Sequence, residues 1–326
     1  MPLASIIVPA FNVAKTLSAT LDALLVQKFV DFEIIVVNDG STDTTAALLH
    51  DYTDRTELKV ITQRNRGLAG ARNTGIAAAR GEFIGFCDAD DLWLPEKLMR
   101  HVAHLQSAPH IGVSYSGSSL IDDCGARLAV TQSPRLKNIT ATHIFKRNPI
   151  GNGSAPVIRR AVFDAIAHRP AKEQTRDWYF DETFRQSEDI ECWLRIALTT
   201  GWQFEGIEGH LTQYRISAGG LSAATDMQLA AWEQMVTKLA LIAPAFFARN
   251  ANAARAYQLR YLARRAISDK DASRATDLIT QSFAASWQPV WEEPHKSVST
   301  LLAALVLRLA GPLALDVIIA QRGTKA

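Results

Sequence analysis

The sequence predicts an α/β fold with a mostly parallel, Rossmann-like central sheet flanked by helices. Short runs of β-branched and other apolar residues alternate with helical patterns through the first 90 of 326 residues. These runs are apolar throughout, not at every second position, which is typical of strands covered by helices on both faces. Short connections between strand and helix favour right-handed crossovers, and hence parallel pairing of the strands.

Four strands and three helices account for most of the first 87 residues. The expected strands cover 5–8, 33–37, 58–62 and 83–87, and helices are expected at about 13–25, 43–49 and 76–79. Beyond residue 95 the pattern loosens, and 122–152 shows no strong periodicity. There we expect helices over 96–106 and 188–198, and strands over 111–116, 203–207 and 211–214.

The last hundred residues differ from the rest in pattern and charge. From residue 226 onward almost every segment has helical spacing, apart from a break at 287–294. We therefore expect a domain of residues 1–225 followed by a C-terminal helical region, residues 226–326. The domain holds 23 basic and 25 acidic residues, and the helical region holds 12 and 8. A solvated helix face accounts for this basic charge, and an anionic partner is the alternative.

One segment of the helical region, residues 301–320, is strongly apolar. It contains Arg308, Asp316 and a Gly311-Pro312 break, and two central charges oppose insertion into a bilayer. We expect a packed helix pair or a homodimer contact. Peripheral contact with a membrane surface and a true span are the remaining alternatives.

Composition narrows the classes of partner and compartment. The chain has 35 basic and 33 acidic residues, a net charge of +2, which argues against nucleic acid as a partner. Cys87, Cys124 and Cys192 form no C-x-x-C pair, so we expect free thiols in a reducing compartment. The amino terminus lacks the basic flank and long apolar run of a signal peptide. These features predict a cytoplasmic protein, at most peripheral at the inner face of the cell membrane.

Polar segments follow each of the four expected strands. They are Pro9–Asn12, Asn38–Asp43, Asn65–Asn73 and Asp88–Asp91. Open parallel sheets bind ligands at the carboxyl ends of their strands, so these segments are expected to share one edge. The sequence has neither a G-x-G-x-x-G after the first strand nor a G-x-x-x-x-G-K-[ST] motif, which argues against dinucleotide dehydrogenases and P-loop NTPases.

The acidic segment is the clearest chemical signal among them. Asp88, Asp90 and Asp91 offer hard oxygen ligands that suit Mg²⁺ or Mn²⁺ bridging two phosphates, and Arg72 would hold the same phosphates. A structural role is the alternative, with Asp91 capping the helix that begins near Pro95 and the other two in a solvated turn. Together with the other three loops, the segment predicts a metal–diphosphate site.

The combination of these segments closely resembles the family 2 glycosyltransferases of GT-A fold. The resemblance is carried by residues 5–12, 37–43, 65–73 and 87–93, and by a later Ser187-Glu-Asp189 stretch like the acceptor-side motif of that family. It covers roughly residues 3–220 and does not extend to the helical region. It implies an inverting transferase that uses a nucleotide-diphosphate sugar.

The resemblance implies a role for each residue of the donor side. Pro9, Ala10 and Asn12 would line the nucleotide pocket, and Asp39 would accept a hydrogen bond from N3–H of uracil or thymine. Turn formation in Asn-Asp-Gly is the alternative for Asp39. Arg72 would contact the base or diphosphate, with a surface salt bridge as its alternative.

The remaining implied roles concern the metal, sugar and acceptor. Asp88 would contact the ribose, and Asp90 would bind Mn²⁺ or Mg²⁺. Asp91 and Trp93 would lie toward the sugar and acceptor, although a core position suits Trp93 equally.

On the acceptor side, the resemblance implies that Asp189 is the general base, with Glu188 beside it. A carboxylate must take the proton of the acceptor hydroxyl as that oxygen attacks C1 of the donor sugar. Helix rules alone explain the same pair, since acids after Ser187 favour the first turn of a helix.

The late strand departs from the family pattern. Many members carry Tyr-Arg-x-His, whereas this chain has serine at the fourth position, Ser217. The processive motif Gln-x-x-Arg-Trp is also absent. We expect single addition from a UDP-sugar, ahead of dTDP- and GDP-sugars, to a saccharide or lipid-linked acceptor in cell-surface polysaccharide synthesis. The alternatives are a catalytically impaired nucleotide-sugar-binding or scaffold protein, and a sugar nucleotidyltransferase.

Overall fold

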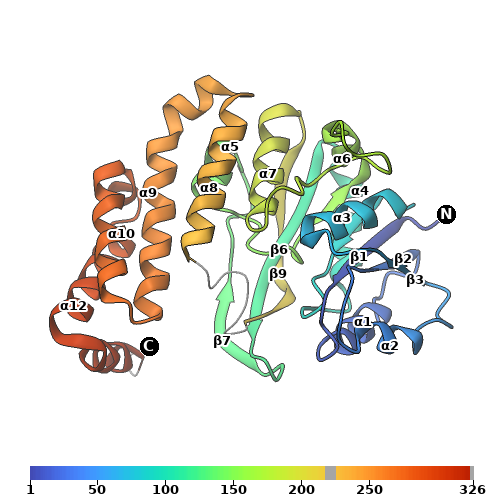
Figure 1. Cartoon of the computed structure of the whole chain (residues 1–326), viewed down its shortest axis with the longest axis horizontal. Helices are drawn as coiled ribbons and strands as arrows, with labels where there is room; N and C mark the ends of the chain where they lie inside the picture. The colour runs from blue at the N-terminus through green and yellow to red at the C-terminus, as the bar shows by residue number, and fades with distance from the viewer. Residues whose placement is uncertain (217–224, 324–326) are drawn as a thin grey trace. The chain divides into compact units, whose positions relative to one another are not determined.

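The computed structural model describes residues 1–216 and 225–323 (Figure 1). Contacts divide the chain into two compact units. The first comprises Met1–Ile144 and Asn148–Ala218, and the second comprises Phe145–Arg147 and Gly219–Ala326. The expected boundary near residue 225 stays a prediction, because residues 217–224 lie outside the described part.

The first unit is built on a single sheet. Within the described residues it has nine strands, in the order β3-β2-β1-β4-β8-β6-β9-β5, with β7 paired to β6. β1, β2, β3 and β4 are mutually parallel, and β6 runs parallel to β9. The strands are β1 Ala4–Ala10, β2 Phe32–Asn38, β3 Leu58–Thr62, β4 Phe83–Phe86, β5 Leu92–Trp93, β6 Ile111–Ile121, β7 Arg127–Gln132, β8 Val157–Arg159 and β9 Gln203–Arg215.

Helices connect these strands and cover the sheet, as the sequence predicted. The expected α/β class with a mostly parallel sheet and flanking helices is confirmed. These helices are α1 Leu17–Leu25, α2 Thr45–His50, α3 Gly67–Ala78, α4 Lys97–Ser107, α6 Arg160–Ile166 and α7 Glu188–Thr199. A further helix, α5 Ala141–Lys146, is divided between the two units, since its last two residues belong to the second.

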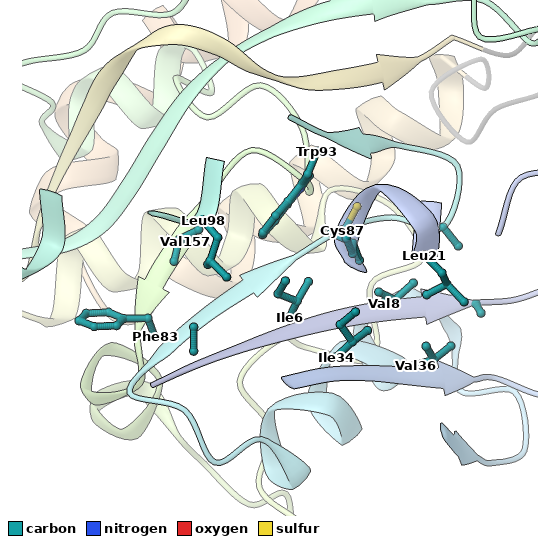
Figure 2. Close-up of a cluster of buried hydrophobic side chains, with 14 of the residues drawn as sticks. Ile6, Val8, Leu21, Ile34, Val36, Phe83, Cys87, Trp93, Leu98 and Val157 are labelled. Carbon is teal, nitrogen blue, oxygen red and sulfur yellow. The ribbon is translucent and has the colours of Figure 1, made fainter. Parts of the chain in front are cut away.

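One hydrophobic cluster fills the space under the parallel strands (Figure 2). Ile6 and Val8 of β1 lie opposite Ile34 and Val36 of β2 in the strand register, and all four are fully buried. Because alternate residues of a strand point to the same face, these four side chains form one apolar layer. This layer holds β1 and β2 in register up to the edge where the polar segments begin.

Several elements differ from the sequence expectation. The two strands predicted over 203–207 and 211–214 are one long strand, β9, whose pairing with β6 shifts register near Gly117. The helix expected at 76–79 begins at Gly67, because most of the polar segment Asn65–Asn73 is the start of α3. Its glycines allow close packing: a Cβ on Gly75 would lie 2.3 Å from Cγ2 of Ile7 in β1.

The second unit is helical in its described residues, as expected. Its helices are α8 Thr225–Ala240, α9 Pro244–Ser268, α10 Ala272–Ala285, α11 Gln288–Glu292 and α12 Pro294–Gly323. Leu262 of α9, Leu278 of α10 and Ala304 of α12 are buried in one core. The break predicted at 287–294 contains the short α11.

α12 is the one helix in the described part that is long and apolar enough to cross a membrane. This statement rests on length and composition over Pro294–Val317, in which an 18-residue window has a mean hydropathy of 1.9 and is 22% buried. α12 is interrupted at Gly311, whose φ of 82° is not helical. Pro312 follows Gly311 directly, and a proline inside a helix accounts for the kink.

Candidate functional site

The carboxyl ends of β1, β2 and β4 lie at one edge of the sheet. β1 ends at Ala10, β2 at Asn38 and β4 at Phe86. The polar segments begin in the last two residues of β1, at the last residue of β2, and two residues after β4. The four segments that the sequence singled out therefore converge, because parallel neighbours end on the same side.

Asn12 holds the loop after β1 against the loop after β2. Its φ is 53°, in the left-handed region that asparagine tolerates. Its Oδ1 accepts hydrogen bonds from the backbone N–H of Thr42 at 2.8 Å and of Asp43 at 3.3 Å. Pro9 and Ala10 are buried in β1, so the backbone is the part of each that can line a pocket.

Asp39 organises the turn into α3. Its Oδ1 accepts hydrogen bonds from Nε2 of Gln63 at 2.6 Å and from the backbone N–H of Arg66 at 2.9 Å. Its Oδ2 accepts from the backbone N–H of Gly67 at 2.8 Å. A carboxylate has about four acceptor positions, so these three donors leave room for one more.

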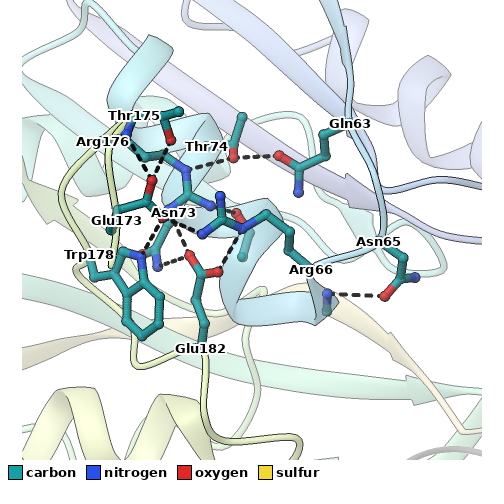
Figure 3. A network of polar contacts seen from close by, with 12 residues as sticks. Gln63, Asn65, Arg66, Asn73, Thr74, Glu173, Thr175, Arg176, Trp178 and Glu182 are labelled. Atoms are coloured by element: carbon teal, nitrogen blue, oxygen red, sulfur yellow. Dashed lines mark hydrogen bonds and ion pairs between the residues drawn. The ribbon is translucent and has the colours of Figure 1, made fainter. Parts of the chain in front are cut away.

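A network of ion pairs joins α3 to the segment 173–182 (Figure 3). Glu182 accepts from Nε of Arg66 at 2.8 Å and from Nη1 of Arg176 at 2.6 Å. Arg66 also pairs with Glu173. Asn73 donates to the backbone carbonyl of Phe180 at 2.8 Å and accepts from the N–H of the same residue, also at 2.8 Å. The sequence predicted no ion pairs for the segment 173–182, which this network anchors ahead of α7.

Arg72 of α3 joins Asp88, in the acidic segment after β4, to Glu188 at the start of α7. It is 2% exposed, and its guanidinium donates to Oδ1 of Asp88 at 2.9 Å and to Oε1 of Glu188 at 2.8 Å. The rings of Phe86 and Phe180 lie 5.8 and 5.5 Å from it. Burial lowers the pKa of Arg72, but the two carboxylates outweigh this effect and raise it.

This placement changes the role we assign to Arg72. The sequence predicted contact with a base or diphosphate, with a surface salt bridge as the alternative. Instead the guanidinium is buried and its η nitrogens are used within the chain. Gly153 makes room for it, since a Cβ there would lie 2.2 Å from Nη2 of Arg72. We therefore describe Arg72 as a positioning residue.

Ser154 clamps the acidic segment that follows β4. Its Oγ accepts from the backbone N–H of Asp88 at 2.8 Å and donates to Oδ2 of Asp91 at 2.5 Å. Its carbonyl accepts from Nε1 of Trp93 at 3.0 Å. Arg215 closes the other side, donating from its backbone N–H to Oδ1 of Asp91 at 2.9 Å.

Asp91 and Trp93 therefore point inward, not toward a sugar or acceptor. Both are buried, and their polar atoms are bonded within the protein. Asp91 does not cap the following helix either, since α4 begins at Lys97. Burial raises the pKa of Asp91, and the neighbouring aspartates raise it further. Its structural role is to fix the turn that presents the other two aspartates.

Replacing Ser154 by alanine is expected to destabilise the protein by about 1–3 kcal/mol. The substitution removes the hydroxyl that donates to buried Asp91 and accepts from the N–H of Asp88. Urea unfolding of the purified variant measures this loss. The matched control is Ser107→Ala, because Ser107 has an exposed hydrogen bond at the end of α4 and its loss is expected to stay within about 0.5 kcal/mol. Equal effects at the two serines would contradict the clamp.

Asp88 and Asp90 are the partly exposed carboxylates of the segment. Burial and the charge of Asp88 raise the pKa of Asp90 to about 6. No group of three metal-binding side chains occurs among the described residues. Two carboxylates are enough to bind Mg²⁺ or Mn²⁺. Such an ion completes its coordination with water and with phosphate oxygens, so it does not need a site made of protein ligands alone.

Glu188 and Asp189 open α7. Ser187 precedes them with a φ of 60° and makes no capping hydrogen bond with its side chain, so capping by Ser187 does not explain the pair. Burial raises the pKa of Glu188 to about 7. Burial also raises the pKa of Asp189, whose Oδ2 accepts from Nδ2 of Asn148 at 3.4 Å. A carboxylate with a raised pKa is a stronger base than one in water.

Tyr214 is a buried tyrosine near the acidic residues of the candidate site, and the sequence assigned it no role. It stands near the end of β9, immediately before Arg215. Burial raises the pKa of its hydroxyl, and the charges of Asp91, Asp88, Asp90 and Asp189 raise it further. The Tyr-Arg pair of the late strand was the sequence signal that could have pointed to this residue. Ser217, the departure from the family pattern, lies outside the described residues.

Solved structures with a similar fold bind nucleotide sugars. S. aureus TarS residues 1–349, in complex with UDP-GlcNAc, matches with a TM-score of 0.53 and 19% identity over 97% of this chain and 83% of that one. The mannosyltransferase PcManGT from Pyrobaculum calidifontis, in complex with GDP-Man and Mn²⁺, matches with a TM-score of 0.55 and 19% identity, over 94% and 87%. At these identities the likeness establishes the fold, which is that of the GT-A glycosyltransferases.

Sequence relatives include proteins of polysaccharide synthesis. The succinoglycan biosynthesis protein ExoO of Rhizobium meliloti is 31% identical over 74% of this chain and 70% of its own. The Escherichia coli protein WfaP, named a UDP-Glc:α-D-GlcNAc-diphosphoundecaprenol β-1,3-glucosyltransferase, is 29% identical over 68% and 81%.

The part of the chain that the family model matches contains the carboxyl ends of β1, β2, β3 and β4. This chain spans only 45%, 27% and 34% of the length of three other relatives. The family model described as "Glycosyl transferase family 2" matches residues 5–167. By that match and by its likeness to ExoO, the chain belongs to glycosyltransferase family 2.

Proposed function

We propose that the protein transfers a sugar from a nucleotide-diphosphate donor, a UDP-sugar first, to a saccharide or lipid-linked saccharide acceptor. The observation that carries the proposal is the bridge from Asp88 through Arg72 to Glu188. It links the segment expected to hold the donor to the helix that carries Asp189. The printed activity of WfaP, a UDP-sugar with a diphosphoundecaprenol acceptor, supports the choice of substrates.

On the donor side, Asn12 and the backbone at Pro9 and Ala10 border the nucleotide. Asp39 offers its remaining acceptor position to N3–H of uracil, which adenine lacks. Asp88 contacts the ribose.

Asp90, aided by Asp88, would hold Mn²⁺ or Mg²⁺ together with the diphosphate. Bound there, the ion would neutralise charge on the leaving diphosphate. The turn fixed by Ser154 orients both carboxylates for that role. In this proposal Arg72 contacts neither the donor nor the metal ion. It sets the position of Asp88.

On the acceptor side, Asp189 accepts the proton of the attacking hydroxyl. The new bond forms between that oxygen and C1 of the sugar while the bond from C1 to the diphosphate oxygen breaks, and the electron pair leaves with the diphosphate. Attack from the face opposite the leaving group inverts the anomeric centre. Glu188 stays engaged with Arg72 and orients the first turn of α7.

Transfer with inversion is expected when the protein is given a UDP-sugar, Mn²⁺ and diphosphoundecaprenol-linked saccharides. An α-linked donor sugar should appear in the product with a β linkage, because direct displacement allows a single inversion. Nuclear magnetic resonance of the purified product identifies the anomer. An α-linked product would contradict the role of Asp189. Formation of a nucleotide-diphosphate sugar and pyrophosphate from a nucleoside triphosphate and a sugar phosphate would instead identify a nucleotidyltransferase.

A further inference from the structure

α12 presents an apolar face outward from its own unit. Ala304, Leu307 and Leu315 form its buried side. On the opposite side, exposed apolar side chains recur every three or four residues, so those before the kink at Gly311 share one helical face and those after it share another. They are Val298, Leu302, Leu305, Leu309, Leu313 and Val317, which we call the α12 apolar face, and Leu309 and Leu313 are 83% and 80% exposed.

Two exposed tryptophans precede α12 in the chain. Trp287 and Trp291, at the start of α11 and within it, are 60% and 79% exposed. Tryptophan is typical of membrane–water interfaces, where its ring meets the acyl boundary and its N–H stays hydrated.

The charges on α12 favour binding to an anionic surface. Within Pro294–Gly323 the basic residues are Lys296, Arg308 and Arg322, and Asp316 is the sole acid. Asp316 already pairs with Lys270. Arg308 is exposed and adjoins Leu309, so its long side chain can reach lipid phosphates while the leucine enters the acyl boundary.

The geometry argues for lying on a membrane and against crossing one. The kink at Gly311 breaks the helix, and Arg308 would stand within the apolar window. The buried face is already committed to α9 and α10, so lipid cannot surround the helix while its unit stays folded.

We propose that the α12 apolar face docks on the surface of an anionic phospholipid bilayer. An exposed apolar face beside an exposed arginine, here Arg308, is the pattern of an interfacial helix, whereas Lys296 already pairs with Glu293. The purpose we give to this docking, bringing the enzyme to a lipid-linked acceptor, rests on the proposed function. The docking itself is inferred from the exposed side chains and does not depend on that function.

Vesicle sedimentation of the full chain tests the proposal. The protein is expected to sediment with vesicles of phosphatidylglycerol and phosphatidylcholine, and more weakly with phosphatidylcholine alone. The double variant Leu309→Glu/Leu313→Glu should bind the mixed vesicles at least about tenfold more weakly, since two apolar contacts are replaced by charges that the lipid repels. The matched control is Leu241→Glu, because Leu241 is 85% exposed in the same unit but lies off α12.

Three outcomes would overturn the proposal. The protein stays in the supernatant with the mixed vesicles, or the double variant binds as tightly as the Leu241→Glu control. In the third, sedimentation velocity finds a dimer that the double variant dissociates while vesicle binding is unchanged, which would assign the face to a second copy. Stabilisation by a UDP-sugar, measured on the same variants without vesicles, reports on the donor site separately and should not change.

Discussion

Replacing Asp189 by asparagine is expected to lower kcat by about 1,000-fold while donor affinity stays unchanged. Asparagine keeps the shape of the side chain and its contact with Asn148 but cannot accept the proton of the acceptor hydroxyl. Since Asp189 belongs to the acceptor side, binding of the nucleotide sugar does not depend on its charge. Transfer kinetics together with a donor titration measure the two quantities.

The control for this variant is Asp164→Asn, an exposed aspartate on α6 in the same unit. It should transfer sugar at the rate of the unmodified protein. If Asp189→Asn also retained that rate, the proton would have another acceptor, and the assignment of the base would be wrong. A catalytically impaired binding protein would instead show no transfer in any variant while still binding the donor.

Replacing Arg72 by methionine is expected to destabilise the protein by about 3 kcal/mol. Methionine fills most of the space between Phe86 and Phe180, but Asp88 and Glu188 lose the positive charge that they share. Asp88 is partly exposed and can be hydrated, so most of the cost falls on Glu188. Chemical unfolding at neutral pH measures the loss in free energy.

The same substitution should lower kcat by about 100-fold, because it releases both Asp88 and the first turn of α7 from their common support. Arg72→Lys keeps the charge but loses the fork that holds two carboxylates at once, so an intermediate loss is expected. The control is Arg169→Met, which removes an exposed pair with Asp177 and should cost less than about 1 kcal/mol. Similar losses for Arg72→Met and Arg169→Met would show that the bridge contributes no more than a surface pair.

The parallel half of the sheet could be read directly from the sequence. β1, β2 and β4 are buried along nearly their whole length, so their residues form unbroken apolar runs that periodicity recognises. β3 is only partly buried, and Lys59 interrupts its apolar run. β5, β7 and β8 were not predicted, because two or three residues of pairing in β5 and β8, and an exposed β7, leave no such pattern.

The candidate site was predicted unevenly for a related reason. Segments at the ends of strands are local in sequence, and the four that converge were all identified. The directions of individual side chains depend on partners far along the chain, as with Asp91 and Ser154, which are 63 residues apart. Residue type alone suggested that Asp91 faces a ligand. The bond to Ser154 turns it inward, and no local pattern encodes that bond.

The most direct test of the account is donor binding measured by thermal shift. UDP-, dTDP- and GDP-sugars are each compared with and without Mn²⁺, since a ligand that binds only the native state raises its melting temperature. We predict a metal-dependent rise with a UDP-sugar that is lost in Asp90→Ala and kept in Asp189→Asn. A melting temperature unchanged by every nucleotide sugar, with the metal present, would contradict the proposed donor site.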